Sequence, residues 1–232
     1  MSIQSGVPRS SRVDFGWIGQ SFEIFSRDSP LWILTALVQA ALVLPIAYYC
    51  NPILFTVVLP GLISGHPGPA PGTNPWAGIE TGFLSAPISS LFLAGWFAMA
   101  NKAVRGEEVG LKDFVSGCRY YGSFLFYNFY YLIATNLGVL ACCVGSMMAW
   151  GLIWPGFAAL ADGYDISTAV EDSWNGMKQD LSNATLLSFV VGLLALGGLM
   201  CCGVGMLVVG PVTVIIGALA YHNMIDTNYT QV

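Results

Sequence analysis

The sequence predicts an all-α polytopic membrane protein in which six transmembrane helices form tandem hairpin repeats. Three observations predict this fold class: the composition, an internal repeat and the placement of the cations. Hydrophobic residues make up 55% of the 232 residues and charged residues only 9%, with a mean hydropathy of +0.67. Soluble domains carry about 25% charged residues, so this chain lacks the charge to cover a surface that faces water.

An internal repeat predicts the hairpin arrangement. Residues 111–161 align with residues 170–220 at an offset of 59 and without gaps, and each copy is long enough to cross a bilayer twice. Residues 21–44 also match residues 173–196, which predicts a third, degenerate copy. Because each copy has an even number of crossings, the copies are expected to run in the same sense around an axis along the membrane normal. Identical pairs include Asp113/Asp172, Gly117/Gly176, Leu137/Leu196, Gly138/Gly197 and Gly151/Gly210.

The N-terminal third of the chain is expected to hold an amphipathic helix, the first span and an external loop. Residues 1–30 are expected to form a cytoplasmic segment with an interfacial amphipathic helix over 13–25, where apolar residues recur at helical spacing. The first span covers residues 31–50, which as a helix would reach about 30 Å, enough to cross the hydrocarbon core. An external loop over 64–79 follows, because its Pro and Gly residues exclude regular structure.

Apolar runs separated by short polar segments define the other elements. The remaining spans are predicted at residues 82–104, 122–143, 145–161, 181–200 and 204–221. They complete a membrane domain over 31–225, followed by a cytoplasmic tail over 226–232. Further amphipathic helices are predicted at 111–118 and 166–178. Such helices either lie in the membrane interface or pack against the cytoplasmic ends of the protein itself, and the sequence favours neither reading.

The cations predict the orientation of the chain. With six spans, all eight Lys and Arg residues fall on one side of the membrane, which by the positive-inside rule is the cytoplasmic side and holds both termini. Some of these cations, together with two tryptophans, are expected to contact lipid headgroups or a partner protein. These contact residues are Arg27, Lys102, Arg105, Arg119, Lys178, Trp17 and Trp174.

Polar residues within the spans are few. No Asp, Glu, Lys or Arg lies in the middle of a predicted span, and such residues are the usual sign of an ion-coupled transporter. Gln39, Asn128, Asn136 and Asp162 are the candidates for a polar cleft. The alternative is that the amides are interhelical hydrogen-bonding groups and that Asp162 ends a helix.

Four cysteines are expected at the outer turns of two hairpins: Cys142, Cys143, Cys201 and Cys202. A disulfide between the hairpins fits an oxidising outer side. Packing of small apolar side chains is the alternative and is the one that the sequence favours.

Catalysis is not expected. His66 and His222 are the only histidines and fall on opposite sides of the predicted membrane, so a two-histidine metal site is disfavoured. Neither a nucleophile elbow nor a phosphate-binding loop occurs, and the sequence predicts no metal and no cofactor. A net charge of −5 argues against nucleic acid as a partner.

Several short motifs resemble a broad group of bacterial six-helix membrane proteins. These motifs are Arg105-Gly106-Glu107-Glu108-Val109, Asp113-Phe114 with Gly117, and Ala159-Leu160-Ala161-Asp162-Gly163 with Ala169 and Ser173 downstream. The group includes uncharacterised domains and the membrane region of some glycerophosphodiester phosphodiesterases. The resemblance covers about residues 12–225 and implies a six-helix fold in the bacterial cytoplasmic (inner) membrane. The phosphodiesterase domain is absent, so the resemblance implies no such activity.

Two functional classes remain. In the first, the chain is a non-catalytic scaffold or accessory subunit whose partners are membrane lipids and other membrane protein subunits. In the second, it transports a lipid or a small apolar solute through a cleft between the repeats. The scarcity of charge within the spans favours the first class.

Overall fold

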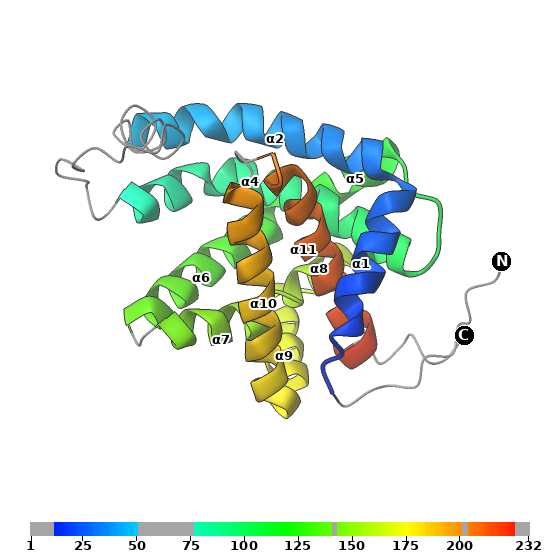
Figure 1. Cartoon of the computed structure of the whole chain (residues 1–232), viewed down its shortest axis with the longest axis vertical. Helices are drawn as coiled ribbons and strands as arrows, with labels where there is room; N and C mark the ends of the chain where they lie inside the picture. Colours follow the sequence, from blue (N-terminus) through cyan, green and yellow to red (C-terminus); the bar gives the residue numbers. More distant parts are fainter. Residues whose placement is uncertain (1–11, 51–76, 141–142, 201–203, 226–232) are drawn as a thin grey trace.

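The computed structural model describes residues 12–50, 77–140, 143–200 and 204–225, which form helices joined by short turns (Figure 1). No strand occurs among these residues. The α-helices are α1 (Gly16–Arg27), α2 (Ser29–Cys50), α4 (Ala77–Val104), α5 (Leu111–Gly117), α6 (Tyr121–Leu140), α7 (Cys143–Ile153), α8 (Gly156–Ala161), α9 (Ile166–Met177), α10 (Leu181–Met200) and α11 (Met206–Ala220). Short 3₁₀ turns η2 (Cys118–Tyr120) and η3 (Lys178–Asp180) lead into α6 and α10, and a π-helical turn η4 (Tyr221–Ile225) follows α11.

Five helical stretches in the described part of the chain are long and apolar enough to cross a membrane. They are Ser29–Tyr49, Glu80–Val104, Val144–Ala161, Ile166–Gly198 and Met206–Ile225. The predicted third span falls on α6, which has 20 residues but is not among the five. Four tyrosines and two asparagines lower the hydropathy of α6. The five helices support membrane integration of the chain.

The first helix of each hairpin lies outside the second. In the most apolar window of each span, 17% of the α2 residues and 28% of the Ile166–Gly198 residues are buried. The corresponding values are 61% for α4, 56% for α7 with α8, and 67% for α11. We therefore call α4, α7/α8 and α11 the inner helices and α2, α6 and α10 the outer helices.

The same packing scheme occurs three times around the molecule. Each outer helix packs against the inner helix of its own hairpin and against the inner helix of the preceding one: α6 on α7 and α4, α10 on α11 and α7, α2 on α4 and α11. The amphipathic helices follow the same rule, with α5 on α4, α9 on α8, and α1 on α11. The first two described helices therefore pack against the last one, and Figure 1 shows α1 beside α11.

The burial pattern corrects the register of the predicted repeat. Residues 29–36, 121–128 and 181–188 share one order of buried, half-buried and exposed positions. Residues 121–128 and 181–188 correspond at an offset of 60, so the predicted gapless offset of 59 is wrong within α6 and α10. The extra residue lies at the end of the amphipathic helix. Gly117, the last residue of α5, aligns with Gly176, whereas α9 continues one residue further, to Met177. The offset returns to 59 at Ala161 and Ala220, the last residues of α8 and α11.

The core lies where the inner helices meet. Ala94, Ala100, Ala158, Ala159, Ala218 and Ala220 are all buried there. Small side chains let helix backbones approach closely when no hydrophobic effect drives helices together in lipid. Larger aromatic side chains fill the remaining space, among them Phe157, whose ring centroid lies 4.6 Å from that of Tyr127 and 5.6 Å from that of Phe97.

One predicted surface residue is buried. Trp17 is only 3% exposed and lies on the side of α1 that also buries Ser21 and Phe25. The prediction that Trp17 contacts lipid or a partner is therefore wrong, because α1 turns this side toward the protein itself. Phe15 and Phe22 are on the other side of α1 and are 37% and 39% exposed.

Gly117 allows the close approach of α5 to α4, which gives a first prediction. A Cβ atom at Gly117 would lie 2.2 Å from the carbonyl oxygen of Ala94, closer than real contacts allow. Gly117→Ala should therefore force the two helices apart and destabilise the protein by about 1–3 kcal/mol, the usual range for overpacking. Thermal unfolding in detergent measures the change.

Gly19→Ala is the matched control. A Cβ atom at Gly19 would meet nothing within 4 Å, so alanine should stabilise the interior of α1 by about 0.5–1 kcal/mol. Equal effects of the two substitutions would contradict the close packing of α5 on α4.

Candidate functional site

A network of polar side chains gathers at the C-terminal end of α4. Asn101 and Arg105 are four residues apart, so the helical period directs both toward the same neighbour, the residue that follows α8. That neighbour is Asp162. Lys102 points elsewhere and meets Asp113 on α5. The last turn of α4 therefore reaches two neighbouring helices at once.

The carboxylate of Asp162 is held from two directions. Asn101 Nδ2 donates to Asp162 Oδ1 at 2.9 Å, and an Arg105 guanidinium nitrogen donates to Asp162 Oδ2 at 2.5 Å. The amide of Asn101 also donates to the carbonyl of Ala158 at 2.9 Å. A carboxylate at the C-terminus of a helix opposes the helix dipole, so the Arg105 cation compensates an unfavourable placement. Gly163, with a φ of 95°, then turns the chain away from α8.

The Asn101 end of this network is shielded from solvent, whereas Arg105 is exposed. Asn101 is 2% exposed, and the side chains of Asp162 and Arg105 are 16% and 31% exposed. Oδ1 of Asn101 is buried and has no hydrogen-bond partner among the described residues. Partial burial strengthens the ion pair, since less water competes with it.

The second ion pair joins α4 to α5. Lys102 Nζ lies 2.6 Å from Asp113 Oδ1, and the backbone N–H of Gly110 donates to Asp113 Oδ2 at 2.9 Å. Burial by itself would raise the pKa of the Asp113 carboxyl. The hydrogen bonds from Lys102 and Gly110, together with the charge of Lys102, outweigh burial and hold that pKa below its usual range.

The other predicted contact residues, apart from the buried Trp17, are all exposed. Arg27 is exposed, and its guanidinium lies 3.4 Å from the carbonyl oxygen of Ala103. Arg119 and Lys178 are exposed and make local contacts only, to the Tyr120 hydroxyl at 2.7 Å and to Asn175 Oδ1 at 2.6 Å. The indole of Trp174 is likewise exposed, since 47% of the residue is accessible.

The residues predicted for a polar cleft do not come together. Asn128 is 5% exposed and donates to Ser90 Oγ at 3.0 Å, which ties α6 to α4 as an interhelical hydrogen bond. Ser90 and Asn101 are eleven residues apart on α4, about 16 Å along the axis, so Asn128 and Asp162 occupy different levels. Gln39 is half-buried on α2. Asn136 donates within its own helix, to the carbonyl of Leu132 at 2.7 Å.

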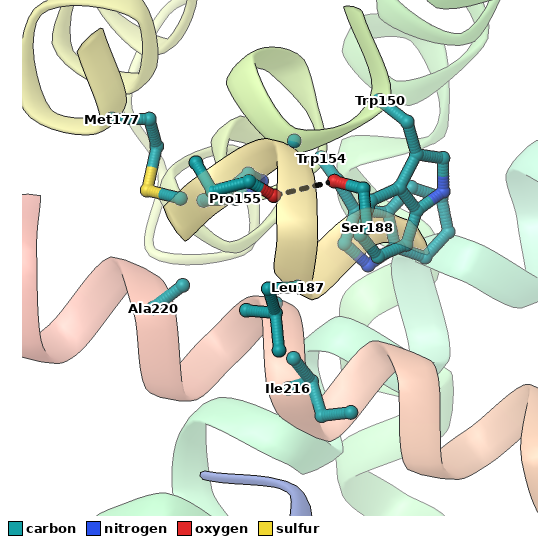
Figure 2. A pocket seen from close by; sticks show the side chains of 11 residues that line it. Trp150, Trp154, Pro155, Met177, Leu187, Ser188, Ile216 and Ala220 are labelled. Atoms are coloured by element: carbon teal, nitrogen blue, oxygen red, sulfur yellow. Dashed lines mark hydrogen bonds between the residues drawn. The ribbon is translucent and has the colours of Figure 1, made fainter. Parts of the chain in front are cut away.

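A small apolar cavity lies between the two predicted main repeats (Figure 2). It leaves about 10 Å³ for the centre of a water-sized molecule, roughly enough for one water. Ser188 faces it, and its hydroxyl donates to the carbonyl of Ala184 at 2.8 Å. None of the four predicted cleft residues lines this cavity. The lining residues are Trp150, Gly151, Trp154, Pro155, Met177, Ala184, Leu187, Ser188, Ile216, Gly217 and Ala220.

Most of the predicted disulfide lies outside the described residues. Cys142, Cys201 and Cys202 are not among the described residues, and Cys143 is the first residue of α7. The prediction of a disulfide between hairpins therefore stays a prediction.

Asn101 is the site residue that the sequence analysis missed. One signal could have found it: Ala98-Met99-Ala100-Asn101 matches Ala159-Leu160-Ala161-Asp162 in pattern. The matching positions end in Asn101 and Asp162, which contact each other.

No family model matches the chain, and no curated protein or solved structure matches it either. The resemblance to bacterial six-helix membrane proteins therefore stays a prediction.

The Asp162 network gives a second prediction. Asp162→Asn should destabilise the protein by about 1–3 kcal/mol, because the Arg105 cation loses its counter-charge in a partly buried place. A double-mutant cycle with Arg105→Gln, followed by thermal unfolding, isolates the pair. We expect the double variant to be less destabilised than the sum of the single variants. Lys178→Gln is the control and should change stability by less than about 0.5 kcal/mol. Strict additivity would show that the pair contributes nothing.

The Lys102–Asp113 pair gives a third prediction, about pH. The folded pKa of Asp113 is lowered, so its contribution to stability is present above the unfolded value of about 3.9 and is lost as pH falls through the folded value. Stability should therefore decrease as pH falls below about 4, and less so in Asp113→Asn. Thermal unfolding between pH 3 and pH 6 measures both slopes. Identical slopes in the two proteins would contradict the role of Asp113.

Proposed function

We propose that this chain is a non-catalytic integral membrane protein that acts as a scaffold or accessory subunit in a larger membrane complex. The observation that carries the proposal is the contrast between an interior held by ion pairs and an outer helix, α2, that is mostly exposed. Ion pairs from α4 hold α5 and Asp162, while only 17% of the apolar window of α2 is buried. A rigid body with weakly covered apolar flanks, of which α2 is the least buried among the five candidate spans, fits a subunit that is packed against others.

The flank of α2 has the chemistry of a helix-packing surface. Its exposed apolar side chains are Leu34, Leu37, Val38, Leu42, Leu44, Tyr48 and Tyr49. At its buried end α2 is fixed, because Trp96 Nε1 donates to Thr35 Oγ1 at 2.9 Å. A helix anchored on one side and open on the other can receive a partner helix without rearranging the core.

We further propose six spans, with α6 as the additional one, and both termini in the cytoplasm. In support, α6 has 20 residues and packs between two helices that are each apolar enough to cross the membrane. The shared burial pattern and packing scheme of the three hairpins support their origin as copies related by an axis along the membrane normal. The cation distribution supports placement in a bacterial cytoplasmic membrane with the Lys and Arg residues inside.

Transport of a lipid or a small apolar solute is the second candidate. The cavity between α7, α9, α10 and α11 favours it, since its lining is apolar and lies between the predicted repeats. A cavity with room for one water does not hold a lipid chain, so this function would require α10 to move away from α7.

The fourth prediction tests the proposed function. The tagged chain, extracted in mild detergent from its native membrane, should be found by mass analysis in a stoichiometric assembly with other membrane proteins. Leu37→Trp on the α2 flank should release those partners, because the larger side chain disturbs a packed interface. Leu193→Trp on α10, which is 50% exposed, is the matched control and should leave the assembly intact. A monomer or small homo-oligomer with bound lipid would favour transport instead.

A further inference from the structure

Helix α5 has two faces with different chemistry. Its inner face holds Asp113, in the ion pair with Lys102, and Phe114, whose ring centroid lies 5.6 Å from that of Phe92 on α4. Its outer face is apolar and basic, and all of its members are exposed. They are Leu111 and Val115, at 55% and 62% exposure, with Lys112 and with Arg119 from η2.

The inner contacts fix the depth of α5 relative to α4. Asp113 meets α4 at Lys102, near the end of that helix, whereas Gly117 meets it at Ala94. These two contact points lie eight residues apart on α4, about 12 Å along its axis. Helix α5 therefore runs back along the last part of a helix that is apolar enough to cross the membrane.

We propose that the outer face of α5 and η2 (Leu111, Lys112, Val115 and Arg119) binds an anionic phospholipid of the leaflet on the cation-rich side. The inference rests on the proposed membrane location of the chain. Leu111 and Val115 would contact acyl chains, since exposed apolar side chains gain by leaving water. The cations would hold the phosphate, and a guanidinium can donate two parallel hydrogen bonds to it.

The charge on this face is available to a ligand. Neither Lys112 nor Arg119 is paired with a carboxylate within the described ranges, whereas Lys102 and Arg105 are. The guanidinium of Arg119 donates to the Tyr120 hydroxyl at 2.7 Å and lies 4.9 Å from the centre of that ring. This contact orients the cation without neutralising it.

The corresponding faces of the other two amphipathic helices carry less positive charge. Because of the extra residue at Met177, Leu111, Lys112 and Val115 correspond to Val170, Glu171 and Trp174, whereas Arg119 corresponds to Gln179. At the offset of 152 from α9, the α1 positions are Ile18, Gly19, Phe22 and Arg27. The faces of α5, α9 and α1 thus carry net charges of +2, −1 and +1. The single cation of the α1 face, Arg27, contacts the carbonyl oxygen of Ala103, and the α5 face carries the largest positive charge of the three.

A charge exchange between α5 and α9 tests the inference. Full-length protein in phosphatidylcholine discs is exposed to rising fractions of phosphatidylglycerol, and native mass spectrometry counts the lipids retained after detergent release. Lys112→Glu lowers the net charge of the α5 face from +2 to 0 and should weaken phosphatidylglycerol retention by at least about 5-fold, the effect of one interfacial cation. Glu171→Lys raises the net charge of the α9 face from −1 to +1 and should increase the retention of phosphatidylglycerol. Retention of phosphatidylcholine should not change in either variant.

The outcomes separate this inference from the proposed function. Unchanged phosphatidylglycerol retention in both variants overturns the lipid site. Displacement of the lipid by soluble glycerol phosphate at equal concentration overturns it too, because the face would then bind a free anion rather than a membrane lipid. Loss of a protein partner in Lys112→Glu, with lipid retention intact, assigns the face to a protein. Failure of the wild-type chain to enter the discs contradicts the membrane location itself. Matched thermal unfolding of the variants and wild type shows that the exposed substitutions leave the fold intact.

Discussion

The close approach of the three inner helices is the constraint on which the rest of the structure depends. Buried alanines such as Ala100, Ala159 and Ala218 bring the backbones of α4, α8 and α11 together, and the aromatic side chains of Phe97 and Phe157 fill the space beside them. An outer helix can then bridge two inner helices at once, as α6 does with α7 and α4. In lipid, where apolar surface gains little from helix association, such shape complementarity carries much of the stability.

Polar groups reinforce this packing at one end and are used sparingly elsewhere. Asp162 receives Asn101 and Arg105 from α4, and Lys102 reaches Asp113, so one helix end positions both neighbours. Within the apolar region, isolated hydrogen bonds such as Asn128 to Ser90 and Trp96 to Thr35 join helix pairs. Of the four residues predicted for a cleft, Asn128 and Asp162 therefore join separate pairs of helix segments at different levels.

Much of the fold follows from local patterns in the sequence. Apolar runs predicted the long helices, and helical spacing predicted α1, α5 and α9, because both depend only on neighbouring residues. Three things depended on tertiary packing. The register shift at Met177 adds a residue without changing the hydrophobic pattern. The amphipathic face of α1 could meet protein or lipid equally well. The contact between Asn101 and Asp162 joins residues that are far apart in the chain. Sequence analysis identified the cations of the site and Asp162, but not their pairing, and it did not assign Asp113 or Asn101 to the site.

Helices α1 and α2 pack against α11, which closes the ring of helices. Photo-cross-linking from α1 in a membrane tests it most directly. Ile18, which packs against the core, would be replaced by a diazirine-bearing residue of similar size, and the adducts would be mapped by mass spectrometry. The closed arrangement predicts adducts within Met206–Ile225. Adducts to lipid alone, or to no part of that segment, would contradict it.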